Sequence, residues 1–125
     1  MRRLTIAGPR GRWHVDVPVT LRERTRGLRG RALDPDHGML LERCRSVHTI
    51  GLAGPITVAF LDASSRVTRV ERARAGRIVF CRRARHVLEC HIGADVRVGD
   101  LLNRQAAPGG PAIPDALGNV RPRRT

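Results

Sequence analysis

The sequence has few aromatic residues, no tyrosine and no lysine. Its aromatic side chains are Trp13, Phe60 and Phe80, so a core must be built mainly from valine, leucine, isoleucine and alanine. Proteins that bind single-stranded nucleic acid or read RNA bases usually stack those bases on aromatic side chains. The shortage of aromatics therefore argues against that class of binding, and the branched aliphatic residues favour β-structure.

Long apolar runs are also missing. No stretch approaches the length of a membrane span, and the apolar part of residues 1–9 is too short for a secretory signal. The chain has 3 cysteines, an odd number that does not suit a disulfide framework. We therefore expect free thiols in a reducing compartment, and a cytoplasmic protein with no membrane span.

Charge is the most unusual property that is present: 24 basic residues oppose 11 acidic ones, a formal net charge of +13. All of these basic residues are arginine. Arginine binds phosphate well, but lysine does so too. The absence of lysine is therefore more typical of a coding bias than of a nucleic-acid surface, and net charge alone indicates only non-specific association.

The strand pattern is clear in several places. Alternating apolar and polar residues predict a strand over 12–19, at an edge or ending at Pro18, which lacks a backbone N–H. The strongest strand covers 56–61 and should be central, because it is apolar on both faces apart from Thr57. Turn residues at 62–65 and a strand over 67–70 make a hairpin with it. Further short strands are expected at 38–41, 78–81, 87–90 and 96–100.

One short helix is predicted in the N-terminal half. Thr20 and Glu23 have the spacing of a capping box, and Gly30 is a suitable end. Several short strands and one helix indicate a mainly β fold, a small sandwich or barrel, with α+β as the alternative. Residues 1–102 should form a single globular domain, and residues 103–125, rich in proline, glycine and arginine, a disordered tail.

The most distinctive stretch is CRSVHTIGL at 44–52, followed closely by PITVAFLD at 55–62. With RER at 22–24, GL at 27–28, GMLL at 38–41, VLE at 87–89 and VGD at 98–100, it resembles the signature of domain-of-unknown-function family 192 over roughly residues 15–102. The resemblance implies a mainly β fold and carries no established activity. Relatives have an acidic residue where this chain has Thr57, which argues against catalysis that needs that carboxylate.

A serine nucleophile is a weak interpretation of this stretch. Ser46 and His48 would share a face of an extended segment. A nucleophile pair also needs a third group to orient the imidazole, and the spacing of Asp62 and Glu89 does not place either one there. A histidine that supports a loop is the favoured interpretation, so we expect no catalytic residue.

A zinc site is also weakly indicated. Cysteine and histidine are zinc ligands, but no Cys-x-x-Cys pair is present, and cysteine is often buried as a small apolar group. We therefore expect neither a metal nor a cofactor. The residues that could have supplied ligands are Cys44, His48, Cys81, Cys90 and His91.

The first functional hypothesis is a non-enzymatic accessory domain that binds a small ligand or a protein partner through the loop at 48–55. Glycines and a proline fix a tight backbone path there. The candidate ligand-binding residues are Ser46, His48, Thr49, Gly51 and Thr57.

The alternative is a basic, nucleic-acid-associated protein that uses the arginine-dense segment 66–85. The segment has no helix-turn-helix or zinc-finger motif, and a solvated, charge-dense surface is the plainer interpretation. Its candidate residues are Arg66, Arg69, Arg72, Arg74, Arg77, Arg82, Arg83 and Arg85. A second alternative is a hydrolase or metal-dependent enzyme built from Ser46, His48 and the cysteines.

Overall fold

The computed structural model describes residues 2–20, 23, 33–106, 113–114 and 120–121. The elements of this part are β-strands, and no described helix is long and apolar enough to cross a membrane. They are β1 (Arg2–Ala7), β2 (Arg12–Val17), β3 (His37–Glu42), β4 (Ser46–His48), β5 (Ile56–Leu61), β6 (Val67–Ala73), β7 (Ile78–Phe80), β8 (His86–His91), β9 (Asn103–Ala106), β10 (Ile113–Pro114) and β11 (Val120–Arg121).

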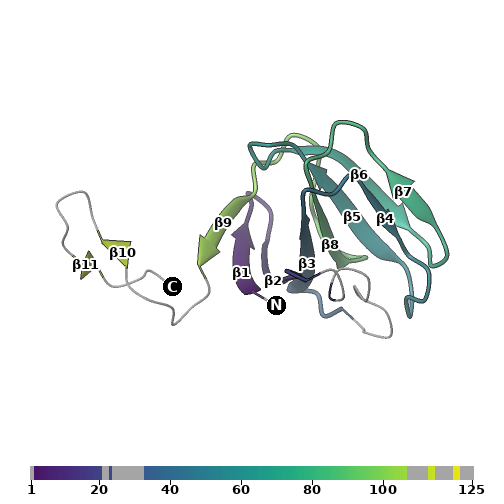
Figure 1. Cartoon of the computed structure of the whole chain (residues 1–125), viewed down its shortest axis with the longest axis horizontal. Helices are drawn as coiled ribbons and strands as arrows, with labels where there is room; N and C mark the ends of the chain where they lie inside the picture. Colours follow the sequence, from purple (N-terminus) through teal and green to yellow (C-terminus); the bar gives the residue numbers. More distant parts are fainter. Residues whose placement is uncertain (1, 21–22, 24–32, 107–112, 115–119, 122–125) are drawn as a thin grey trace.

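Seven strands form one sheet in the order β6-β5-β8-β3-β2-β1-β9 (Figure 1). Neighbouring strands in this sheet are antiparallel, except for β2 and β3, which are parallel. The sheet curls until its two edges meet at one end. There, the N–H of Val67 donates to the carbonyl of Asp100 at 2.8 Å, and the N–H of Leu102 donates to Ser65 at 2.9 Å. The result is a half-barrel, so the predicted mainly β fold is confirmed.

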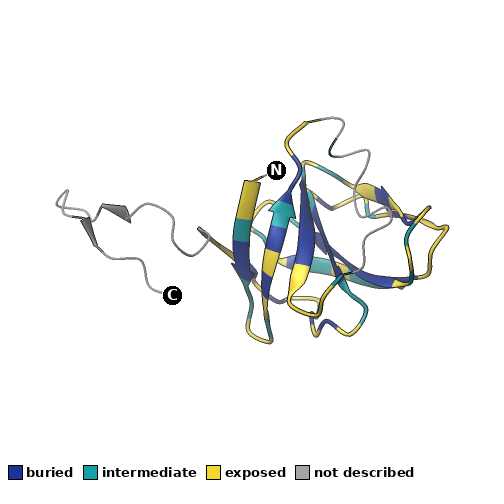
Figure 2. Ribbon diagram, turned by 90° about the horizontal axis from the view of Figure 1, so that it is seen from below, coloured by how far each residue is buried: buried dark blue, intermediate teal, exposed yellow. Residues whose placement is uncertain are grey.

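The sheet has an apolar core on each face because its central strands are apolar on both sides. The inner face of the curl is filled by Trp13, Val15, Leu40 and Leu88, among others. The outer face carries a second cluster that includes Val58 and Phe60. Figure 2 shows buried residues along the strands of the sheet and exposed residues at the turns.

A separate two-stranded sheet, β4 with β7, covers the outer face. Val47 and Val79 are the middle residues of these strands, and both belong to the outer cluster. The flanking residues of both strands are exposed. The small sheet therefore has one face on the core and one face in solvent. A third small sheet pairs β10 with β11.

Several predicted strands are present. All six residues of β5 are buried, and β5 lies between β6 and β8 as a central strand should. The hairpin of β5 with β6 is also confirmed. The strand predicted over 12–19 ends at Val17, directly before Pro18, and lies inside the sheet rather than at its edge. The strand expected at 96–100 is wrong, because that segment is irregular and leads into a turn.

The capping box is present: the N–H of Thr20 donates to Glu23 Oε1 at 3.0 Å, and the N–H of Glu23 donates to Thr20 Oγ1 at 3.1 Å. The remainder of the predicted helix, at 21–22 and 24–32, lies outside the described residues. At the other end, β9 pairs with β1. The main sheet therefore continues to Ala106, four residues past the boundary set at 102.

Candidate binding groove between β6 and β7

The loop that the sequence singled out has a structural centre at Thr49, which is fully buried. Its Oγ1 donates to the carbonyl of Arg74 at 2.6 Å and accepts from the N–H of Arg77 at 2.8 Å. Its backbone N–H donates to the carbonyl of Arg77 at 2.7 Å, and its carbonyl accepts from Gly76 at 3.0 Å. Thr49 thus holds the turn between β6 and β7 in place and is not available to a ligand.

Two other predicted residues also have structural roles. Thr57 is fully buried in β5, and its hydroxyl donates to the carbonyl of Ile92 at 3.0 Å. Gly51 has a φ of 83° in the turn after Thr49, a conformation that favours glycine. Both residues therefore help to fix the fold around the loop; Thr57 is buried, whereas Gly51 is exposed.

Ser46 and His48 lie on the exposed face of β4. Their partners across the small sheet are Phe80 and Ile78, respectively, which are also exposed. Asp62 does not reach them: it accepts from the N–H groups of Ser64 and Arg66 in the β5–β6 turn. The described residues therefore do not assemble a serine, a histidine and an orienting carboxylate.

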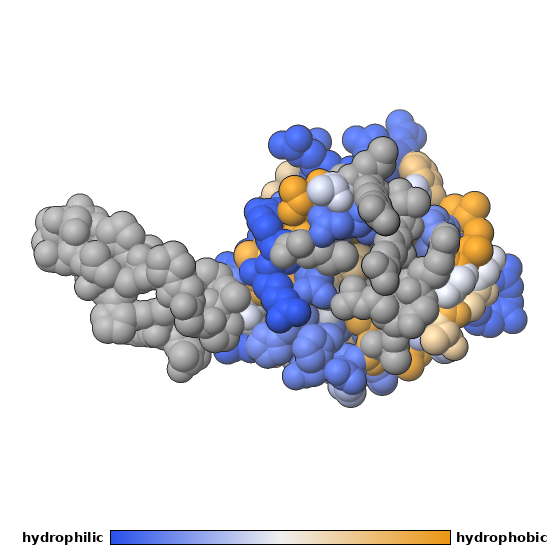
Figure 3. All heavy atoms as spheres, turned by 60° about the horizontal axis from the view of Figure 1, so that its bottom comes forward, coloured by the Kyte–Doolittle hydropathy of each residue, from blue (hydrophilic) through white to orange (hydrophobic). Residues whose placement is uncertain are grey.

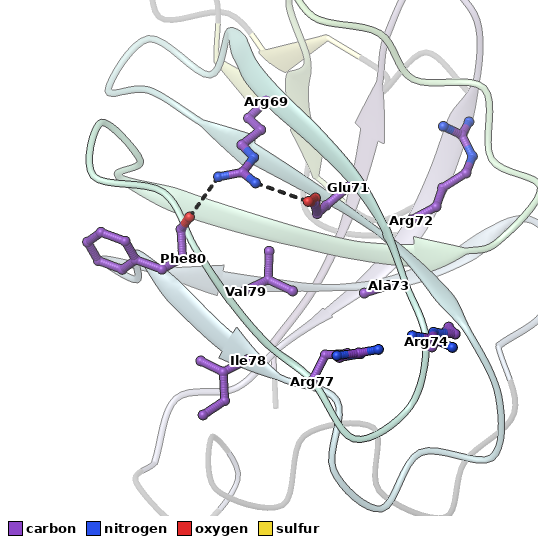
Figure 4. Close-up of a pocket in the computed structure, with 9 residues that line it drawn as sticks. All are labelled: Arg69, Glu71, Arg72, Ala73, Arg74, Arg77, Ile78, Val79 and Phe80. Atoms are coloured by element: carbon purple, nitrogen blue, oxygen red, sulfur yellow. Dashed lines mark hydrogen bonds and ion pairs between the residues drawn. The ribbon is translucent and has the colours of Figure 1, made fainter.

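A groove of about 350 Å³ runs between β6 and β7 (Figure 4). Its floor is apolar, with the buried side chains of Ala73 and Val79. Its walls are strongly basic, and Glu71 is the single acid that lines it. The basic residues that line it are Arg69, Arg72, Arg74 and Arg77.

Arg69 connects the two strands across the groove. Its Nη1 donates to the carbonyl of Phe80 at 3.0 Å and its Nη2 contacts Glu71 Oε1 at 3.0 Å (Figure 4). No described residue forms an ion pair with the side chains of Arg74 or Arg77, which come from the turn that Thr49 holds. The groove therefore combines one anchored guanidinium with two uncompensated ones.

Of the eight candidate arginines, four do not line the groove: Arg66, Arg82, Arg83 and Arg85. Arg72 also reaches back to the carbonyl of Ala94 at 3.4 Å, and Arg66 donates to Gly99 at 2.7 Å near the closed edge of the sheet. Arg82, Arg83 and Arg85 follow the opposite end of β7 and are all exposed. The eight arginines proposed for nucleic acid thus divide among separate places, and the groove brings only half of them together.

Glu89 is a feature that the sequence reasoning did not select as a site. It lies on the outer face of β8 between Met39 and Val58, both fully buried. Its exposed fraction is 4%, and no described residue bonds to its carboxyl. Burial raises its pKa from 4.5 to about 7. The sequence feature that could have marked Glu89 is its position as an acidic residue within the apolar run at 87–90.

The cysteines are not gathered into a ligand set. Cys44 Sγ donates to the carbonyl of Ser46 at 2.9 Å, and Cys90 is buried in the inner core. Burial raises the pKa of the Cys90 thiol to about 12, with a smaller contribution from the Glu89 carboxyl. Among the described residues there is no cluster of histidine, cysteine and acidic side chains able to hold a metal ion.

Comparison with known proteins identifies one family model, DUF192, described as an uncharacterized ACR, which matches residues 3–102. A structure from Sinorhizobium meliloti, provisionally named as a transcription regulator, is 24% identical with a TM-score of 0.66, covering 82% of this chain and 92% of that one. A protein of unknown function from Novosphingobium aromaticivorans is 21% identical with a TM-score of 0.64, covering 81% and 83%. At these identities, the two similarities show a shared fold only. No curated protein matches.

Proposed function

Because the chain belongs to the DUF192 family, which has no established activity, we propose its function from the groove: the protein is a non-enzymatic binding domain for a ligand that carries carboxylate or phosphate groups. The observation that carries the proposal is the convergence of Arg69, Arg74 and Arg77 on one groove that contains a single acid. Guanidinium groups form charge-assisted, often bidentate hydrogen bonds with both kinds of anion.

The signature loop at 48–55 supports this site indirectly. Four hydrogen bonds from Thr49 fix the backbone of the turn that carries Arg74 and Arg77. A turn fixed in this way loses less conformational freedom on binding, and that favours affinity. The expectation of a binding site near the loop is therefore kept, but its contact residues are proposed on the neighbouring turn.

Binding is favoured over catalysis by what surrounds the polar side chains. Ser46 and His48 are exposed on the small β4–β7 sheet. Of the two carboxylates considered as orienting groups, Asp62 is bonded within the β5–β6 turn and Glu89 is buried in the outer core. Nucleophilic catalysis needs such an orienting group as well as a donor set for developing negative charge. The groove supplies cationic donors without a nucleophile beside them.

The test is an NMR titration of the isotopically labelled protein with pyrophosphate and, separately, with oligo-glutamate. Chemical-shift changes should concentrate on β6, β7 and the turn between them. The double variant R74E/R77E should abolish them, whereas R82E/R83E, with the same change in net charge, should leave them in place. Shifts that follow both arginine pairs equally, or no shifts at all, would overturn the proposal.

A further inference from the structure

The groove lies between two strand edges that are not paired in any described sheet. β6 is the terminal strand of the seven-stranded sheet, and β7 pairs only with β4. Unpaired strand edges present rows of backbone N–H and C=O groups that can pair with another extended chain. The site therefore offers backbone hydrogen-bonding groups as well as positive charge.

The backbone of β7 is oriented for such pairing. Hydrogen bonds at Arg77 and Cys81 run to the β4 side, at 2.7 Å and 2.9 Å. Because the direction alternates along an antiparallel strand, the groups of Ile78 and Phe80 aim the opposite way, toward β6. The contact of Arg69 with the carbonyl of Phe80 at 3.0 Å agrees with this direction. The carbonyl of Ile78 and the N–H groups of both residues remain for an incoming strand.

The solvent face of β7 is apolar. Ile78 is 76% exposed and Phe80 is 55% exposed. Figure 3 shows apolar side chains among hydrophilic ones at the β4–β7 end of the molecule. A strand added beside β7 would place every second side chain next to these two residues and the others toward the arginines. Aliphatic side chains suit the first position, and carboxylates suit the second.

A nucleic acid fits these features less well. Strong duplex binding rests on several phosphate contacts along the helix, about 6–10 in a typical example. The arginines that line the groove are four: Arg69, Arg72, Arg74 and Arg77. Glu71 is an acid within the groove, and Ile78 is a large aliphatic side chain at its rim. Neither is suited to a sugar-phosphate backbone.

We infer that the groove binds an extended peptide segment of a partner protein, in which acidic and aliphatic residues alternate, by addition of a strand to the free edge of β7. The inference rests on the proposed function, because it assigns the occupant of the same arginine groove. Backbone hydrogen bonds supply part of the affinity, and Arg69, Arg74 and Arg77 select for carboxylates on alternate side chains.

Fluorescence anisotropy with a labelled peptide of alternating aspartate and valine tests the inference. A peptide of the same composition with its aspartates and valines in separate blocks is the first control. The second control is the alternating peptide with every other amide N-methylated. It is made in two versions, one methylated at the aspartate amides and one at the valine amides. N-methylation removes backbone donors and leaves the charge unchanged.

We expect the alternating peptide to bind at least about tenfold more tightly than the block peptide. We expect one of the two N-methylated versions to bind at least about tenfold more weakly than the unmethylated alternating peptide. Equal affinity for all four peptides, or tighter binding of a labelled DNA duplex, would overturn this inference. If pyrophosphate or oligo-glutamate still mapped to the groove, the proposed function would stand. If these probes also failed to map there, both would fall.

Discussion

At the scale of single residues, Glu89 couples stability to pH. Below about pH 4.5 its carboxyl is protonated in both the folded and the unfolded chain, because its folded pKa is raised to about 7. Between these values it is ionised only in the unfolded chain, so stability falls as pH rises. Above about pH 7 the ionised carboxyl is buried, which corresponds to a cost of about 3 kcal/mol.

Replacing Glu89 by glutamine should remove this dependence. The free energy of unfolding of the parent, measured in urea, should fall relative to E89Q by about 3 kcal/mol between about pH 4.5 and pH 8. His86, whose pKa is lowered mainly by burial, titrates in both proteins and cancels in the comparison. Parallel pH profiles for the two proteins would show that Glu89 does not titrate in this way.

Thr49 is the second residue whose substitution should change the free energy of unfolding. The variant T49V keeps the volume but leaves the carbonyl of Arg74 and the N–H of Arg77 without their side-chain partner. We expect a loss of about 2 kcal/mol in the free energy of unfolding. T49S keeps the hydroxyl and should lose less than about 1 kcal/mol. Equal losses in both variants would mean that the methyl group, and not the hydrogen bonds, is what matters.

At the scale of elements, the sequence predicted best those strands whose pattern is strong in isolation. β5 is apolar throughout, and the turn residues after it specify the hairpin with β6. β1 was not predicted, because only its last four residues are shielded from solvent. β4 has three residues, too few for an alternation to be recognised, and exists through its pairing with β7 and its packing on the outer core.

The groove could not be predicted from the sequence, because it too depends on tertiary packing. It depends on where β7 lies relative to β6, which is set by long-range packing of Val47 and Val79 on the outer face. The sequence did mark both of its components, the loop at 48–55 and the arginines at 66–85, but as competing hypotheses. The hydrogen bonds of Thr49 join them.

β3 and β8 pair so closely that there is no room for a side chain at Gly38. A Cβ added at Gly38 would lie 2.7 Å from the backbone carbonyl of Glu89, which cannot move without disturbing the sheet. G38A should therefore lower the free energy of unfolding by about 1–3 kcal/mol. G54A is the matched control, because nothing lies within 4 Å of its added Cβ. A G38A protein as stable as G54A would contradict the described register.

At the scale of the whole molecule, the half-barrel depends on both of its edges. β9 adds a strand to β1, and Arg104 on β9 bonds Glu42 of β3 at 2.7 Å. Glu42 also pairs with Arg2. These contacts tie residues beyond 102 into the fold, so we propose that the domain extends at least to Ala106.

Truncation tests that boundary. A chain that ends at Ala106 should unfold at the same urea concentration as the full chain, because within the described part of residues 107–125 β10 and β11 pair only with each other. A chain that ends at Leu102 loses β9 and its contacts with β1. It should be less stable by about 1–3 kcal/mol. Equal stability of the two truncated chains would place the boundary at 102 after all.

In the proposed function, the convergence of arginines between β6 and β7, rather than total charge, determines what this molecule binds. The most direct measurement is the affinity of labelled oligo-glutamate for the parent, R74E/R77E and R82E/R83E, each at about 50 and 200 mM salt. We expect R74E/R77E to lose at least about tenfold in affinity at both salt concentrations, while R82E/R83E stays within about threefold of the parent. Equal losses in the two variants would mean that oligo-glutamate binding depends only on net charge, and that the groove is not its binding site.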